Sequence, residues 1–170
     1  MHSMDSIDSV GSFGSVADED FLRLDLQVCF SLHSAARAFN AAYRTALKEL
    51  GLTYPQYLVM LVLWEHGELP VKKIGAYLRL DSGTLSPLLK RLESADLVER
   101  RRSRDDERSV TVRPTENGIA LRARALAVPR RIATATGLPL DEIRELRTRL
   151  NVLAEALDAA DLAADAADES

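Results

Sequence analysis

The sequence lacks long apolar runs, is poor in aromatic residues and holds one cysteine, and each shortage excludes a class of protein. No apolar stretch approaches the ~18 residues that a membrane-spanning helix needs, and no basic flank precedes an apolar segment at the N-terminus. Aromatic residues make up only 5% of the chain, which disfavours a β-sandwich. A single cysteine excludes an internal disulfide. We therefore expect a cytoplasmic protein with no membrane partner, no metal and no cofactor.

The residue types that are abundant in the chain favour helices. Of the 170 residues, 46% are apolar, mainly leucine and alanine. This length fits one domain with a substantial core. The composition predicts a mainly helical protein.

Charge is strongly segregated along the chain. Residues 1–20 and residues 158–170 each hold five acidic side chains and no Lys or Arg, whereas the whole chain has a net charge of only −4. Residues 70–114, by contrast, hold eleven Lys and Arg against seven Asp and Glu. We predict a disordered acidic tail at 1–20, which is rich in Ser and Gly, an acidic C-terminal tail at 161–170, and a phosphate-facing surface in the basic segment.

Hydrophobic periodicity between these tails predicts a helix-turn-helix followed by a hairpin. A short helix at 71–78 and a second helix from Asp81 to about Ala95 have the spacing of a helix-turn-helix. Alternating residues at 97–102 and 109–114 predict two strands around a charged loop. The remaining helices are expected at 21–50, 54–66, 115–136 and 139–160. The expected fold is mainly α with a small β-hairpin wing, a winged helix-turn-helix.

This combination favours DNA binding, because a helix fits the major groove and a basic hairpin reaches an adjacent groove or the backbone. The DNA-binding core is expected at about 54–114. The alternatives are a solvated hairpin in another α+β domain and, for the small hydroxyls, an ordinary capping role. The candidate DNA-binding residues are Ser82, Thr84, Ser86, Lys90, Arg91, Arg104 and Arg108.

The helices at both ends of residues 21–160 are amphipathic and lie outside this core. Such helices bury their apolar stripes most easily against a second copy, which also presents two recognition helices to a pseudo-palindromic operator. We therefore expect dimerisation helices at about 21–50 and 115–160. A monomeric bundle is the alternative.

Cys29 lies in the first helix, with His33 one turn later. Buried cysteine is common as a small hydrophobe, so a structural role is the simpler interpretation. A Cys–His pair on one face also favours a reactive thiolate, and without a third orienting group a catalytic site is not supported. Tyr43 and Tyr54 are consistent with plain core or interface aromatics.

The segments LDLQVCFSLHSAAR, TYPQYLVMLVLWEH, LDSGTLSPLLKRLE and RRSRDDERSVTV resemble the MarR family, and specifically its organic-hydroperoxide-resistance branch, over about residues 21–157. The resemblance implies that Cys29 is the peroxide-sensing thiol and Arg108 the wing-tip arginine. It also implies that Tyr43 and Tyr54 from the partner subunit hydrogen-bond the sulfur, and that oxidation releases DNA.

Two features depart from this pattern. His33 stands where relatives often carry tyrosine, and no second, resolving cysteine is present, so an external thiol is required to react with oxidised Cys29. The sequence thus predicts a homodimeric, DNA-binding repressor, not an enzyme, that senses organic hydroperoxides. The alternatives are a repressor released by a small aromatic ligand and a thiol peroxidase.

Overall fold

The computed structural model describes residues 22–102 and 109–168, and side chains up to residue 160. The chain divides into two compact parts, residues 1–39 and residues 40–170. We describe each part by itself.

The first part holds a 3₁₀ turn, η2 (Leu24–Leu26), and the beginning of helix α1 (Val28–Leu47). The α-helix is therefore shorter at both ends than the single helix expected over 21–50. It begins only after Gln27, which has an extended backbone (φ −81°, ψ 111°), and it is followed by a 3₁₀ turn, η3 (Lys48–Leu50). Many of its large apolar side chains are exposed: Leu22, Leu24, Leu26, Val28, Phe30 and Phe39. This part of the chain therefore has an apolar surface that is exposed to solvent.

The second part begins with the expected buried helix, α2 (Tyr54–His66). The backbone N–H of Thr53 donates to Oε1 of Gln56 at 2.9 Å, which satisfies a donor at the helix start. Gly67 ends the helix with a φ of 72°, a conformation that favours glycine. Tyr57, Val59, Met60 and Leu63 are buried, so the prediction of a buried helix is confirmed.

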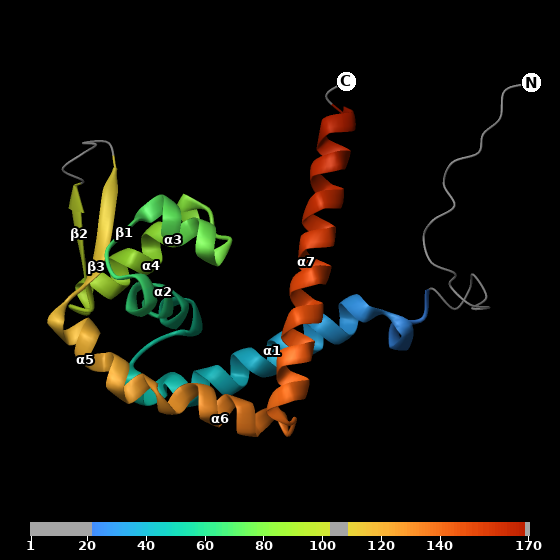
Figure 1. The fold of residues 1–170 in the computed structure, drawn as a ribbon, viewed down its shortest axis with the longest axis horizontal. Helices are drawn as coiled ribbons and strands as arrows, with labels where there is room; N and C mark the ends of the chain where they lie inside the picture. The colour runs from blue at the N-terminus through green and yellow to red at the C-terminus, as the bar shows by residue number, and fades with distance from the viewer. Residues whose placement is uncertain (1–21, 103–108, 169–170) are drawn as a thin grey trace, which may run out of the picture. The chain divides into compact units, whose positions relative to one another are not determined.

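The helix-turn-helix is present as predicted. It comprises α3 (Val71–Leu78) and α4 (Ser82–Ser94), joined by a turn in which Arg79 has a φ of 53°. Gly75 allows the turn to approach, because a Cβ there would lie 2.7 Å from the carbonyl oxygen of Leu80. In Figure 1, α3 and α4 lie beside the strands.

The wing is an antiparallel sheet in the order β1-β3-β2, formed by β1 (Leu69–Pro70), β2 (Val98–Arg102) and β3 (Val110–Pro114). The hairpin strands were expected, whereas β1 was not. Two residues ending in a proline carry no alternating pattern, and β1 is recognisable only from its pairing of Leu69 with Val112.

In the C-terminal half, the observed bounds of two helices differ from those expected. The helix expected over 115–136 is two helices, α5 (Glu116–Ala125) and α6 (Ala127–Thr136). Pro129 explains the break, because it has no N–H for the carbonyl of Ala125 and crowds that group. The last helix, α7 (Leu140–Asp168), continues eight residues past the expected end at Ala160.

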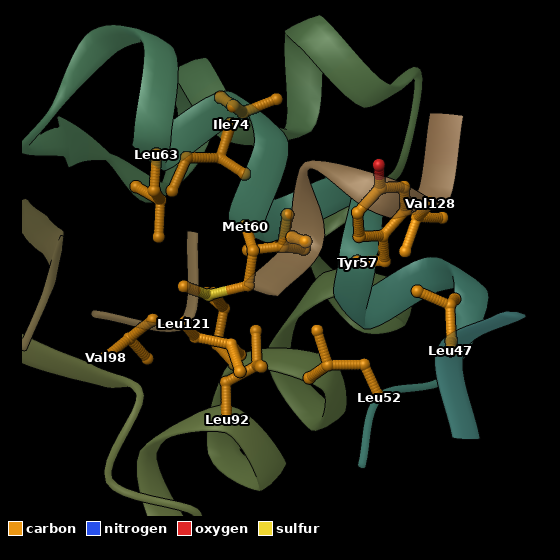
Figure 2. Close-up of a cluster of buried hydrophobic side chains, with 14 of the residues drawn as sticks. Leu47, Leu52, Tyr57, Met60, Leu63, Ile74, Leu92, Val98, Leu121 and Val128 are labelled. Atoms are coloured by element: carbon orange, nitrogen blue, oxygen red, sulfur yellow. The ribbon is translucent and has the colours of Figure 1, made fainter. Parts of the chain in front are cut away.

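One core holds the second part together. Figure 2 shows Met60 of α2 clustered with side chains from α4, β2 and α5, among them Leu92, Val98 and Leu121. This cluster ties the helix-turn-helix to the wing. Among the helices that the structure describes, none is long and apolar enough to cross a membrane.

Candidate DNA-binding surface and thiol site

Helix α4 buries one face and exposes the other. Leu85, Leu89 and Leu92 are at most 1% exposed and fix the helix on the core. The predicted contact residues lie on the exposed remainder: Ser82, Thr84, Ser86, Lys90 and Arg91. The helix thus presents hydroxyls near its start and two cations farther along, which suits a groove with phosphates at its edges.

Thr84 also has a capping role. The carboxylate of Asp81 accepts the backbone N–H of Thr84 at 2.8 Å and the Thr84 hydroxyl at 2.8 Å. The hydrogen bond from the Thr84 backbone is the main cause that lowers the pKa of Asp81. The Thr84 hydroxyl is therefore already used within the cap, and DNA contact by Thr84 stays a prediction.

An open groove of about 720 Å³ separates the helix-turn-helix from the wing. Lys72 of α3, Ser82 and Ser86 of α4, and Arg100 and Ser109 of the wing contribute its polar lining. Sequence reasoning missed Lys72 as a groove residue. Its position near the start of the first helix of the motif was the available signal.

Most arginines in the described stem of the wing are paired within the chain. Arg100 binds Glu93 at 2.6 Å, Arg101 lies 3.0 Å from Glu99, and Arg113 also binds Glu99. Arg104 and Arg108, which the sequence assigned to DNA, lie outside the described residues. The stem therefore offers less free positive charge than its arginine count suggests.

The candidate thiol is accessible. Cys29 is exposed in the first turn of α1, and its Sγ lies 3.9 Å from Oε1 of Gln27 as a weak donor. His33, one turn later, is also exposed. Within the single chain, Cys29 does not have the buried position on which a structural role was based. Among the described residues, no group of three or more His, Cys, Asp or Glu is arranged to hold a metal ion.

The two tyrosines implied by the resemblance are neighbours in the second part of the chain. The rings of Tyr43, on α1, and Tyr54, on α2, have centroids 4.3 Å apart, and Tyr57 lies 6.0 Å from Tyr43. Burial, together with the neighbouring tyrosines, raises the pKa of Tyr43 to about 12, and burial also raises the pKa of Tyr54. Both hydroxyls therefore stay protonated at neutral pH and can donate hydrogen bonds to an anion.

Comparison with known proteins identifies the type of regulator. A family described as the transcriptional regulator SarA/Rot matches residues 41–123. The chain is 43% identical to the organic hydroperoxide resistance transcriptional regulator of Bacillus subtilis over 138 residues, which cover 81% of this chain and 94% of that one. It is 48% identical to the regulator TtmR of Methylorubrum extorquens over 141 residues, covering 83% and 72% of the two chains.

Solved structures agree with these relatives. Reduced AbfR of Staphylococcus epidermidis, bound to DNA, has a TM-score of 0.68 and 37% identity over 83% of this chain and 99% of that one. Overoxidised AbfR bound to DNA has a TM-score of 0.69 with the same identity and coverage. These relatives are regulators, so the peroxidase alternative is not supported. The chain belongs to the MarR/SarA type of winged-helix, DNA-binding transcriptional regulators.

Proposed function

We propose that the protein is a homodimeric repressor that senses organic hydroperoxides through Cys29 and releases its operator when this thiol is oxidised. The observation that carries the proposal is the exposed position of the chain's one cysteine. An exposed thiol is open to a small oxidant, whereas a buried one is inert. The Bacillus relative is named for organic hydroperoxide resistance, which supports the choice of oxidant.

The chemistry needs no second cysteine in the chain. The Cys29 thiolate attacks the O–O bond of the hydroperoxide, an S–O bond forms, and the alkoxide leaves and takes up a proton. Sulfur is oxidised by two electrons to sulfenic acid, and the peroxide is reduced to an alcohol. An external thiol then condenses with the sulfenic acid to give a mixed disulfide and water.

We assign Tyr43 and Tyr54 to stabilising the thiolate across the dimer. Tyrosine hydroxyls, with an ordinary pKa of 10.0, are already protonated at neutral pH, and burial raises the pKa of both further, so each hydroxyl can donate to the partner subunit's Cys29. His33, exposed one turn from Cys29, is assigned to the same thiol environment.

A second copy explains the exposed apolar side chains at both ends of the described chain. Val28 is 66% exposed on α1, and Val152 and Leu157 are each 61% exposed on α7. Apolar surface of this extent is costly in water and marks an association surface. The dimer would present two α4 helices to a pseudo-palindrome whose half-sites lie about one helical turn of DNA apart. We place this regulator in the cytoplasm, where it reaches DNA.

The switch is tested with Cys29→Ser. A gel shift on the DNA upstream of the chain's own gene, with and without cumene hydroperoxide, should show release of the parent and retention of Cys29→Ser. Serine keeps the shape, but its hydroxyl is not nucleophilic at neutral pH. A matched control moves the thiol: Cys29→Ser combined with Ser31→Cys should stay bound, because residue 31 projects from another face of α1.

One outcome favours a different signal. If Cys29→Ser leaves DNA at the same peroxide dose as the parent, the thiol is not the sensor. An open pocket of about 400 Å³ between α2, α5 and α6, lined by Tyr57, Trp64 and Arg122 among others, then becomes the candidate site for a small aromatic acid.

A further inference from the structure

One arginine in the groove between the helix-turn-helix and the wing is held by a single carboxylate. Arg100 of β2 donates to Oε2 of Glu93, in the last turn of α4, from Nη2 at 2.6 Å and from Nε at 2.9 Å. The backbone N–H of Arg100 donates to Oε1 of the same residue at 3.3 Å. Glu93 therefore fixes both the strand and the guanidinium relative to the end of α4.

This pair is better defined than an ordinary surface ion pair. Isolated exposed pairs contribute little, because two long side chains lose freedom and water screens their charges. Here Nη2 and Nε of the planar guanidinium both donate to Oε2 of Glu93, and the backbone N–H of Arg100 donates to Oε1 of the same carboxylate. The hydrogen bond from Arg100 lowers the pKa of Glu93, so this carboxylate stays ionised.

The guanidinium keeps donors for another partner. Nη1 of Arg100 has no partner among the described residues, and it carries two N–H groups. Arg100 lines the groove together with Lys72 and Ser86, whereas Arg101 and Arg113, which share Glu99, do not line it. Arg100 is thus a paired cation that still faces the groove.

We propose that Arg100 contacts a DNA phosphate in this groove and that Glu93 is a positioning residue for that contact. Glu93 holds the guanidinium at a fixed distance from the recognition helix, so that DNA binding does not have to order a free arginine. The proposal rests on DNA binding alone and is independent of the thiol switch.

Glu93→Gln separates positioning from simple neutralisation, because the two roles predict opposite changes in DNA affinity. If Glu93 only neutralises Arg100, removing its negative charge frees a cation beside DNA and tightens binding. If Glu93 positions Arg100, Glu93→Gln weakens binding about three- to tenfold, the size expected when one charge-assisted hydrogen bond is impaired.

Binding is measured by fluorescence anisotropy over a range of salt concentrations under reducing conditions. The probes are a labelled duplex from upstream of the chain's own gene and a duplex of unrelated sequence. Arg100→Met should weaken binding to both probes and reduce the salt slope by about one, because one phosphate contact is lost. Adding Glu93→Gln to Arg100→Met should cause no further loss.

Glu99→Gln is the matched control, since it also removes one carboxylate that pairs with stem arginines, but the arginines paired with Glu99 do not line the groove. Its affinity should equal or exceed that of the parent. The proposal is overturned if Glu93→Gln binds as tightly as Glu99→Gln, or if Arg100→Met keeps the parent's salt slope. If Glu93→Gln does not fold, Arg100→Lys is the deciding variant, because lysine keeps the positive charge but lacks the planar guanidinium that Glu93 holds. DNA affinity equal to that of the parent would then reject the positioning role of Glu93. A parent that binds neither duplex rejects the DNA-binding function itself.

Discussion

Replacing Gly118 by alanine tests how tightly α5 is docked against the start of the wing. Gly118 is the third residue of α5, and an added Cβ would overlap the carbonyl oxygen of Leu97 and lie 3.3 Å from Cε of Met60. Its N–H donates to Oγ1 of Thr115 at 3.0 Å, and its carbonyl accepts from Nε1 of Trp64 at 2.8 Å. Gly118 cannot move aside without straining these two hydrogen bonds.

Two effects oppose each other in Gly118→Ala. Helix propensity alone favours alanine by about 1 kcal/mol. Overpacking against a backbone carbonyl costs about 1–3 kcal/mol, and impairing a hydrogen bond costs roughly 1 kcal/mol more. Because Leu97 is backbone and cannot rotate away, we expect steric overlap to prevail and the free energy of unfolding to fall by about 2 kcal/mol, which lowers Tm by roughly 4–8 °C in a chain of this size.

Urea unfolding, followed by the fluorescence of Trp64, the one tryptophan, measures this change. Ala123→Gly is the control, since residue 123 is exposed on the same helix and should lose only about 1 kcal/mol through propensity. A Gly118→Ala protein as stable as the parent, or more stable, would refute the packing argument and show that propensity governs this turn.

Three further predictions address the DNA surface and the tyrosine cluster. Arg108→Ala should lower operator affinity by about 1–3 kcal/mol if this wing residue reads a base or a narrow groove, and by less if it contacts one phosphate; anisotropy titration that finds equal affinity removes the wing tip from recognition. Since the pKa of Asp81 is lowered from 3.8, its ionised carboxylate stabilises the fold above pH 3.8, and this stability is lost as pH falls through the lowered pKa. Urea unfolding at several pH values should show that Asp81→Asn loses less stability in acid than the parent does. Since the pKa of Tyr43 is raised from 10.0 to about 12, stability should fall as pH rises between these values, and Tyr43→Phe should reduce that alkaline loss and remove a late step from the tyrosinate absorbance titration.

The helix-turn-helix and the buried helix before it, α2, were predictable because their signals are local. Asp81 caps α4, Thr53 and Gln56 begin α2, and the apolar spacing of Leu85, Leu89 and Leu92 marks a buried face. Each signal lies within a few residues of the element that it specifies. Capping residues and apolar spacing of this kind can be recognised from the sequence alone.

The missed features depend on distant partners or on geometry. Strand β1 exists through its pairing with β3, more than forty positions away in the chain, and its two residues have no pattern of their own. The pairing of Arg100 with Glu93 depends on how the turn after α4 folds back, which residue spacing alone does not give. Sequence reasoning therefore treated the basic segment 70–114 as a phosphate-facing surface, and the structure assigns most of the described stem arginines to internal pairs.

An acidic chain can bind DNA only if unpaired positive charge collects on one face, and the pairing changes where that charge lies. Eleven Lys and Arg occupy residues 70–114. Among the described residues, four of them are paired within the chain: Arg79 with Asp158, Arg100 with Glu93, and Arg101 and Arg113 with Glu99. The cations without an ion pair among the described residues include Lys72 on α3 and Lys90 and Arg91 on α4. Salt-dependent affinity should therefore come chiefly from the two helices, the wing tip and Arg100, whose Nη1 keeps free donors at the groove, at about 0.9 in slope per phosphate neutralised. A slope that requires all eleven cations in each subunit would mean that these internal pairs open when DNA binds.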